Sequence, residues 1–177
     1  MNFFKILTII LFFTLIFTYS FSQKGNTVLI SNSTKCVFSN EKILDSFSIK
    51  LVGSTLLKAT VYFSIFDHQQ KMIYRDSFPS IYLLDYSIEN HDPLTKKENY
   101  IKKRMKEFFS KENFQQPAIG KDEPFDTDYT EILKSTLDEI QSDPKRNGFY
   151  YYTDGENGKQ ITFSKKLKKV VIYRACC

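Results

Sequence analysis

A strict alternation of apolar and polar side chains is the feature that most limits the fold of this chain. Within residues 57–65 every second residue is apolar, and the residues between them are Lys58, Thr60, Tyr62 and Ser64. A period of two is typical of a strand with one buried face. Residues 47–52 alternate in the same way, and Gly53-Ser54 between the two segments is a turn signal. The sequence therefore predicts two consecutive strands of an antiparallel sheet.

The hydrophobic period changes near Asp92-Pro93. Asp92 is a suitable helix cap, and Pro93 fits the first turn of a helix, where no amide donor is needed. An apolar stripe then predicts an amphipathic helix over 93–111; its members are Ile101, Met105, Phe108 and Phe109. A second helix is predicted from Thr127 or Asp128 onward. Its expected buried face is Tyr129, Ile132, Leu133, Thr136, Leu137 and Ile140.

Short apolar runs at both ends of the chain predict the remaining strands. These runs are 27–31, 71–75, 149–153, 160–164 and 167–175. The order is strands, then two helices, then strands, which is typical of the α+β class. We therefore expect a single α+β domain, with an antiparallel sheet and two central amphipathic helices packed on one face.

The N-terminal segment has the three parts of a secretory signal peptide. Lys5 provides a positive charge, residues 6–19 are mainly apolar, and Ser20 and Ser22 are small residues at the expected cleavage positions. The apolar run is shorter than the roughly 20 residues of a membrane span. We therefore predict a signal peptide over 1–22 and an exported domain over 23–177, secreted or periplasmic, with no membrane span after cleavage.

The cysteines fit an oxidising compartment, where a disulfide is expected. Three are present, Cys36, Cys176 and Cys177, so one is left without a partner within the chain. The preferred bridge joins Cys36 to Cys176 or Cys177. A bond between the two adjacent cysteines ranks second because it strains the peptide unit between them. Metal binding by this adjacent pair ranks third, since zinc sites use spaced ligands.

Catalytic and metal-binding patterns are weak. The only histidines are His68 and His91, both in predicted turns, and no nucleophile motif accompanies them. The acidic stretch 122–131 lacks the glycine that a calcium loop needs at its sixth position. The spacing of Gly155 and Gly158 is too short for a phosphate-binding loop. We therefore predict no catalytic residue, no metal and no cofactor.

Two other features suggest a binding surface. Basic side chains gather around the last predicted hairpin, and these are Lys165, Lys166, Lys168, Lys169 and Arg174. In the strand at 149–153, Tyr150 and Tyr152 share one face and Phe149 and Tyr151 the other. One of these pairs is expected to pack in the core, and the other is a candidate exposed aromatic patch. Removal of Lys5 lowers the net charge from +5 to +4, too small for a nucleic-acid footprint.

These observations favour a non-catalytic binding domain, an accessory or inhibitor-like protein. The expected partner is a protein or an anionic component of the cell envelope, and no nucleic acid. One alternative is an extracytoplasmic hydrolase that uses carboxylates, His68 or His91. Another alternative is a purely structural envelope protein.

Overall fold

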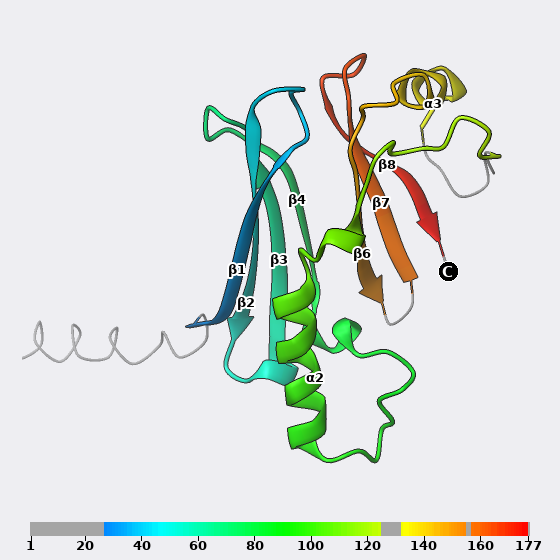
Figure 1. The fold of residues 1–177 in the computed structure, drawn as a ribbon. Coiled ribbons are helices and arrows are strands. Elements are labelled where there is room, and N and C mark those ends of the chain that lie inside the picture. Colours follow the sequence, from blue (N-terminus) through cyan, green and yellow to red (C-terminus); the bar gives the residue numbers. More distant parts are fainter. Residues whose placement is uncertain (1–26, 125–131, 155–156, 177) are drawn as a thin grey trace, which may run out of the picture.

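The computed structural model describes residues 27–124, 132–154 and 157–176 and confirms the α+β class. The strands form two four-stranded antiparallel sheets (Figure 1). Sheet A contains β1 (Thr27–Val37), β2 (Leu44–Gly53), β3 (Ala59–Phe66) and β4 (Met72–Pro79), in that order. Sheet B contains β5 (Phe114–Gln115), β6 (Gly148–Asp154), β7 (Asn157–Ser164) and β8 (Lys169–Cys176), in that order.

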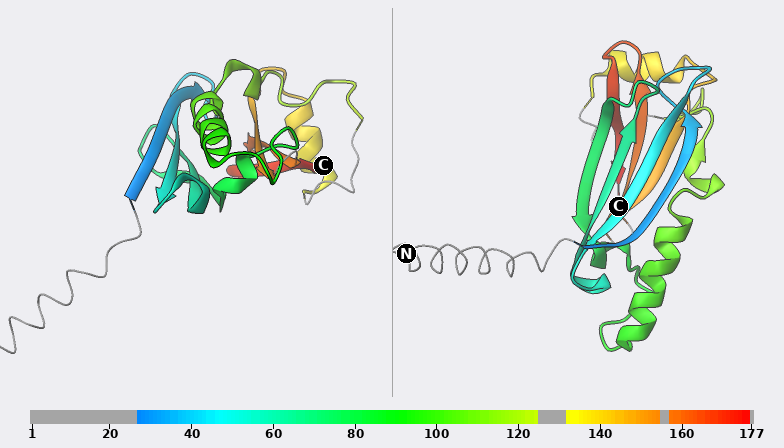
Figure 2. Two further views of the ribbon diagram at one scale, coloured as in Figure 1. Left: turned by 90° about the horizontal axis from the view of Figure 1, so that it is seen from below. Right: turned by 90° about the vertical axis from the view of Figure 1, so that its left-hand side faces the viewer.

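Two α-helices and three short 3₁₀-helices connect the strands. The α-helices are α2 (Leu94–Glu107) and α3 (Lys134–Gln141), and the 3₁₀-helices are η1 (Leu56–Lys58), η2 (Ser80–Leu83) and η3 (Lys111–Asn113). Helix α2 and sheet B lie on the same side of sheet A (Figures 1 and 2). Helix α3 packs on sheet B beside β7 (Figure 1). The expected strands are thus divided between two sheets, each with its own helix.

The alternation in β2 and β3 sorts their side chains as expected. Phe47, Ile49 and Leu51 of β2 are completely buried, as are Val61, Phe63 and Ile65 of β3. The residues between them point to the other face and are half-buried or exposed. Antiparallel pairing places Ile49 opposite Phe63, so the two strands present one continuous apolar face.

The main core fills the space between sheet A, α2 and sheet B. The Phe63 ring contacts the rings of Phe108 at 5.4 Å, Phe149 at 5.5 Å and Tyr151 at 5.0 Å between centroids. Several of these contacts are edge-to-face, the favourable geometry for aromatic quadrupoles. Ile101 and Met105 of α2 are completely buried against the same cluster, which confirms the expected apolar stripe.

A second, smaller core lies on the other side of sheet B. It is formed by Ala118, Ile119, Leu137, Ile140, Val171 and Tyr173. Tyr173 donates a hydrogen bond to the carbonyl of Ala118 at 2.7 Å, so its buried hydroxyl has a partner. Sheet B is therefore covered on both faces. Sheet A is covered on one face only by the described part of the chain (Figure 2).

Several expected boundaries are wrong. Strand β1 extends to Val37, because it pairs with β2 along its whole length. Helix α3 begins at Lys134, and the extended backbone of Leu133 turns that side chain outward, leaving it 77% exposed. The expected burial of Thr136, Leu137 and Ile140 is confirmed, whereas Tyr129 lies outside the described residues.

The expected start of the first helix is also displaced. Pro93 occupies the N-cap position of α2, and no side chain caps this end of the helix. Asp92 instead accepts hydrogen bonds from the Lys96 ammonium, at 2.8 and 2.9 Å, and from the backbone amide of Glu89. The carboxylate thus ties the preceding segment to the first turn of the helix.

Candidate functional site

A groove of about 690 Å³ lies at one end of the molecule. It lies between η2, the segment 84–93 and the first turn of α2, with contributions from η1 and the end of β6. Its lining residues are Leu57, Ile81, Tyr82, Leu84, Asp85, Tyr86, Ile88, Glu89, Asn90, Leu94, Lys97 and Asp154. We call this set the groove.

The groove exists because η2 sorts its own side chains. In a 3₁₀-helix the residues three apart lie on one side. Ser80 and Leu83 are such a pair and are buried, and the Ser80 hydroxyl accepts a hydrogen bond from the amide of Ala59 at 3.3 Å. Ile81 and Tyr82 therefore face outward and line the groove.

Large apolar side chains in the groove are exposed to an unusual degree. Tyr86 is 77% exposed, Leu94 67%, Ile81 47% and Tyr82 36%. Isolated exposed apolar residues are common, but contiguous ones that line a concavity mark interaction sites. Tyr82 and Tyr86 thus provide an exposed aromatic surface in the groove.

Side-chain hydrogen bonds order the segment that carries Tyr86. The Asp85 carboxylate accepts bonds from the amide and the hydroxyl of Ser87 and from the Tyr100 hydroxyl of α2. Burial opposes ionisation of Asp85, but these hydrogen bonds outweigh it and lower its pKa below the usual value. Asp85 therefore stays charged and holds the segment against α2.

The groove is also acidic, in a chain whose net charge is +5. Asp85, Glu89 and Asp154 line it, against a single cation, Lys97. The Lys97 ammonium is engaged with the carbonyl of Asn90 at 2.7 Å. Opposite charges on two surfaces favour their encounter and exclude wrong partners. The groove thus suits an apolar ligand that carries positive charge.

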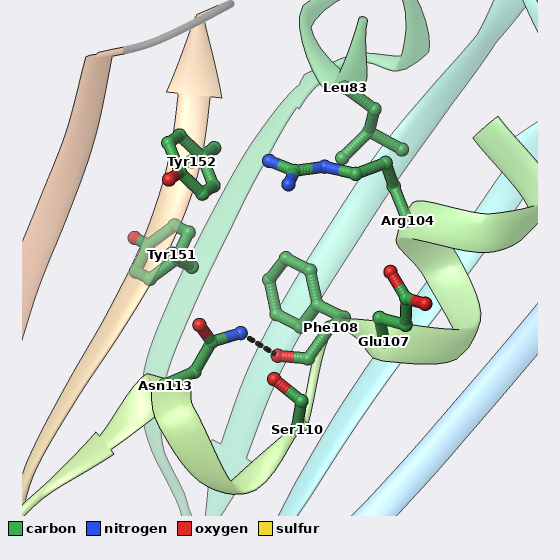
Figure 3. A pocket seen from close by; sticks show the side chains of 8 residues that line it. All are labelled: Leu83, Arg104, Glu107, Phe108, Ser110, Asn113, Tyr151 and Tyr152. Atoms are coloured by element: carbon green, nitrogen blue, oxygen red, sulfur yellow. Dashed lines mark hydrogen bonds between the residues drawn. The ribbon is translucent and has the colours of Figure 1, made fainter. Parts of the chain in front are cut away.

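A smaller pocket of about 100 Å³ lies between the end of α2, η3 and β6 (Figure 3). The Arg104 guanidinium lies over the Tyr152 ring, 4.2 Å from its centroid, in cation–π geometry. Asn113 donates a hydrogen bond to the carbonyl of Phe108 at 2.9 Å and ties η3 to the helix end. This volume admits only a few waters or a small ion.

A hydrogen-bond network of side chains lies next to this smaller pocket, which Tyr151 also lines. The Tyr151 hydroxyl lies 2.6 Å from the Tyr74 hydroxyl and donates to the Asp76 carboxylate, also at 2.6 Å. Lys159 pairs with the same carboxylate at 2.7 Å. Burial raises the pKa of Tyr74 to about 12 and also that of Tyr151, so both phenols are protonated donors at neutral pH. The network joins β4 of sheet A to β6 and β7 of sheet B.

The expected basic cluster is only partly assembled. Lys165 forms ion pairs with Glu41 at 2.5 Å and Asp143 at 2.9 Å, and Lys166 donates to the Ser135 hydroxyl. Lys168 occupies the turn of the hairpin with a φ of 53°, and Lys169 begins β8. These four lysines lie together at the β7–β8 turn.

Arg174 does not join the lysines. It lies five residues further along β8 than Lys169, a distance of about 16 Å in a strand. Its guanidinium pairs with Glu123 at 2.6 Å. The cationic surface expected here is thus divided, and two of its members, Lys165 and Arg174, are already paired with carboxylates.

The two expected tyrosines share one face of β6, as the alternation predicts, and are half-buried. The Tyr150 ring lies across Gly158 of β7, so closely that a Cβ added there would meet the ring at 2.3 Å. The Tyr152 ring lies under Arg104 and 4.9 Å from the Tyr150 ring. Both rings therefore pack against neighbouring elements.

The histidines lie at opposite ends of β3. His68 is in the turn after β3. His91 is in the segment 84–93, between η2 and α2. Both histidines are exposed. His91 contacts Glu89 at 3.1 Å. Eight residues of strand separate the two ends, about 26 Å. Across the described ranges, no three side chains of the metal-ligating types gather into a possible site.

Cys36 forms no disulfide within the described part of the chain, and burial raises its pKa to about 11. The side chain of Cys176 and the whole of Cys177 lie outside the described residues. The backbone of Cys176 pairs with Gly158, which is opposite Tyr152. Cys36 instead lies next to Val37, whose carbonyl accepts a hydrogen bond from Asn147. Asn147 comes just before the first residue of β6, whereas Tyr152 lies near its last residue. Asn147 and Tyr152 are five residues apart, a distance of about 16 Å along a strand. A disulfide spans less than 7 Å between Cα atoms, so the expected Cys36–Cys176 bridge is inconsistent with this register.

Comparisons with known proteins return nothing: no family model, no curated protein and no solved structure matches the chain. Among the described residues, no helix is long and apolar enough to cross a membrane. The expected signal peptide at 1–22 lies outside the described residues.

Sequence reasoning missed the groove, although part of its signal was present. Residues 81–86 form an apolar run without the strict alternation of a half-buried strand and too short for an amphipathic helix. Such a run that follows Pro79 and precedes a predicted helix is consistent with a connection that exposes its apolar side chains. Nothing in the sequence, however, indicates that Leu57 and Asp154 join it.

Proposed function

We propose that this protein is an exported, non-catalytic binding domain that captures a partner protein in the groove. The occupant is an apolar segment of the partner flanked by lysine or arginine. One observation supports the proposal above all others. Four large apolar side chains that a folded domain would ordinarily bury line one ordered, open concavity.

The geometry favours a peptide segment over a small metabolite. The groove is open and about 690 Å³ in volume, and most of its lining comes from one continuous stretch, 81–94. Tyrosine and leucine are suited to anchor a partner because each buries a large area on binding. The hydrogen bonds of Asp85 hold this stretch in place, which lowers the ordering cost of binding.

Export supports the same proposal from the sequence. The signal-peptide features of residues 1–22 favour work outside the cytoplasm, where an accessory or inhibitor-like protein would meet its partner. The mass of the protein recovered from its own compartment tests this part. A chain that begins at Gln23 is expected, and a chain that retains Met1 would contradict export by cleavage.

A peptide-display selection against the purified protein tests the groove. The expected result is enrichment of short sequences with a large apolar residue next to lysine or arginine. The substitution pair Tyr86→Ser and Leu94→Ser should weaken the selected peptides by about a hundredfold, because each anchor contributes roughly 1–2 kcal/mol or more. Native mass spectrometry of the protein from its own compartment should show a partner that contains such a segment.

The matched control removes exposed apolar side chains elsewhere. Leu133 is 77% exposed and Leu167 is 42% exposed, and neither lines the groove. The pair Leu133→Ser and Leu167→Ser should leave peptide affinity unchanged. Selected peptides that bind both variants equally well, or a selection without any enrichment, would rule out the groove as the docking site.

A further inference from the structure

The outward face of sheet A carries a band of hydroxyl and cationic side chains across all four strands. Strand register places two rows of residues side by side on this face. One row is Ser33, Ser48, Ser64 and Arg75, and the other is Ser31, Lys50, Tyr62 and Ser77. We call these eight residues the hydroxyl band.

The hydroxyl band faces away from the rest of the molecule. Helix α2 and sheet B lie on the other side of sheet A, and Figure 2 shows the strands from the outside with no described segment in front of them. Lys50 and Arg75 are exposed, while Ser48, Tyr62 and Ser64 are half-buried by their neighbours in the sheet. Within the described residues, none of the six hydroxyl groups of the band has a hydrogen-bond partner in the protein, and the serines Ser31, Ser33 and Ser77 are exposed.

The outward face of sheet A also lacks carboxylates. The two carboxylates within its strands, Asp45 and Asp76, point to the inner side. Asp45 is completely buried and accepts hydrogen bonds from Ser39, and Asp76 pairs with Lys159 of sheet B. Lys35, in the row next to the band, adds a third positive charge. All charged side chains on the outward face of these strands are therefore positive.

We propose that the hydroxyl band binds an anionic polysaccharide. Serine and tyrosine hydroxyls both donate and accept hydrogen bonds, as the hydroxyls of a sugar chain do. Lys50 and Arg75 provide charge-assisted bonds to acidic groups along that chain. The Arg75 guanidinium lies over the Tyr62 ring, 5.6 Å from its centroid, and so fixes one aromatic surface beside the serine rows. The regular spacing of the two rows across the strands suits an extended repeating chain.

The same observations disfavour a nucleic acid. Nucleic-acid binding depends on many phosphate contacts and on successive aromatic rings on which bases stack. The outward face offers Lys35, Lys50 and Arg75, and the band holds a single aromatic ring, already paired with Arg75. Hydroxyl groups outnumber cations in the band, which is the opposite of a phosphate-tracking surface.

Isothermal titration with oligomers of polygalacturonate, a polymer of acidic sugars, tests the proposal. We expect binding that weakens as salt is added, and a loss of about tenfold or more in the Lys50→Glu, Arg75→Glu variant. The control Lys102→Glu, Lys103→Glu makes the same charge change at two exposed positions of α2 and should bind like the unmodified protein. Equal losses in both variants would show only a response to net charge and overturn the proposal, as would a lack of binding by the unmodified protein.

A second variant separates sugar recognition from simple charge attraction. Ser48→Ala with Ser64→Ala removes two central hydroxyls and leaves the charge unchanged. It should weaken polygalacturonate binding several-fold, because hydrogen bonds to sugar are lost. Single-stranded DNA of the same charge should bind at least tenfold more weakly than polygalacturonate. DNA that binds as well as the sugar polymer, or a serine variant with full affinity for it, would overturn the proposal in favour of a general polyanion surface.

Discussion

The groove and the hydroxyl band are two exposed regions of one small domain, and they differ in nearly every physical respect. The groove is concave, apolar and acidic, and mainly a connecting segment builds it. The hydroxyl band lies on the open face of a sheet, is rich in hydroxyls and positive, and four strands build it. The small excess of positive charge over the whole chain therefore conceals two regions of opposite sign.

This difference teaches how one core supports two kinds of surface. In β2 and β3 the buried and outward residues alternate, so every outward side chain is held in place by its buried neighbours. In the groove, Ser80 and Leu83 are the buried anchors, and hydrogen bonds of Asp85 order the rest. Opposite charges also mean that a ligand suited to one region is repelled by the other.

The largest effect is expected from a change in the main core, against which both regions pack. Phe63 is completely buried and contacts rings of α2 and β6. Phe63→Ala should lower the free energy of unfolding by about 3–5 kcal/mol, because it leaves a cavity in the main core. The neighbouring change Tyr62→Ala, on the outward face, should cost about 1 kcal/mol or less. Denaturant unfolding of both variants measures the difference, and similar losses would contradict the separation of the two faces of sheet A.

The next largest effect is a loss of stability from a residue, Arg146, that belongs neither to the groove nor to the hydroxyl band. Arg146 is 4% exposed and pairs with Glu139 and Asp143, both at 2.9 Å, while it also donates to the carbonyl of Phe163. Arg146→Met should lower the free energy of unfolding by about 2–3 kcal/mol, because Glu139 and Asp143 both lose the buried guanidinium, although Asp143 keeps its ion pair with Lys165.

The Arg146→Met variant should nevertheless bind both proposed ligands with unchanged affinity below its unfolding temperature. Lys97→Met is the matched comparison because it also replaces a cation by methionine, but at a residue that lines the groove. It should alter peptide affinity and leave the free energy of unfolding nearly unchanged. Loss of either ligand in Arg146→Met would show that the α3 region is coupled to a surface.

A crossed binding experiment tests whether the two regions are independent. The Tyr86→Ser, Leu94→Ser variant should lose peptide affinity and keep polygalacturonate affinity within about twofold, and the Lys50→Glu, Arg75→Glu variant should do the reverse. Sites that share no partners are expected to act additively, within about 0.5 kcal/mol. A variant that weakens both ligands would show that they compete for one surface.

The smallest effect is a difference in response to acid. The folded-state pKa of Asp85 is lowered, so its contribution to the order of the groove is present above the unfolded pKa of about 3.9. That contribution is lost as the pH falls through the lower folded value. The protection factors of the amides in residues 84–93, which correct for the pH dependence of intrinsic exchange, should therefore fall in acid, while those in β2 and β3 stay high. Asp85→Asn should exchange faster in this segment at neutral pH and lose the acid response; an unchanged response would assign the effect to another carboxyl.

Much of the fold could be predicted from local patterns. The burial of Phe47 and Phe63, the outward position of Tyr62 and the apolar stripe of α2 follow from periods of 2 and 3.6 residues. The reach of β1 and the late start of α3 did not follow. Strand β1 is held by pairing with β2 over polar residues, and Leu133 is exposed because the backbone there is extended. The periodicity of apolar residues does not determine which strands pair or in which direction the backbone runs.

The sequence by itself determined every strand except the two-residue β5, the main helix, which face of β2 and β3 is buried, and the signal-peptide features on which the proposal of export rests. Only the tertiary structure decided that the strands form two sheets and which sheet keeps a free face, since a strand's alternation says nothing about its partners. It also decided the groove, where Leu57, Tyr82, Lys97 and Asp154 meet from distant parts of the chain. A local pattern records which side chains avoid water, whereas a site depends on which segments the packing of the core brings together.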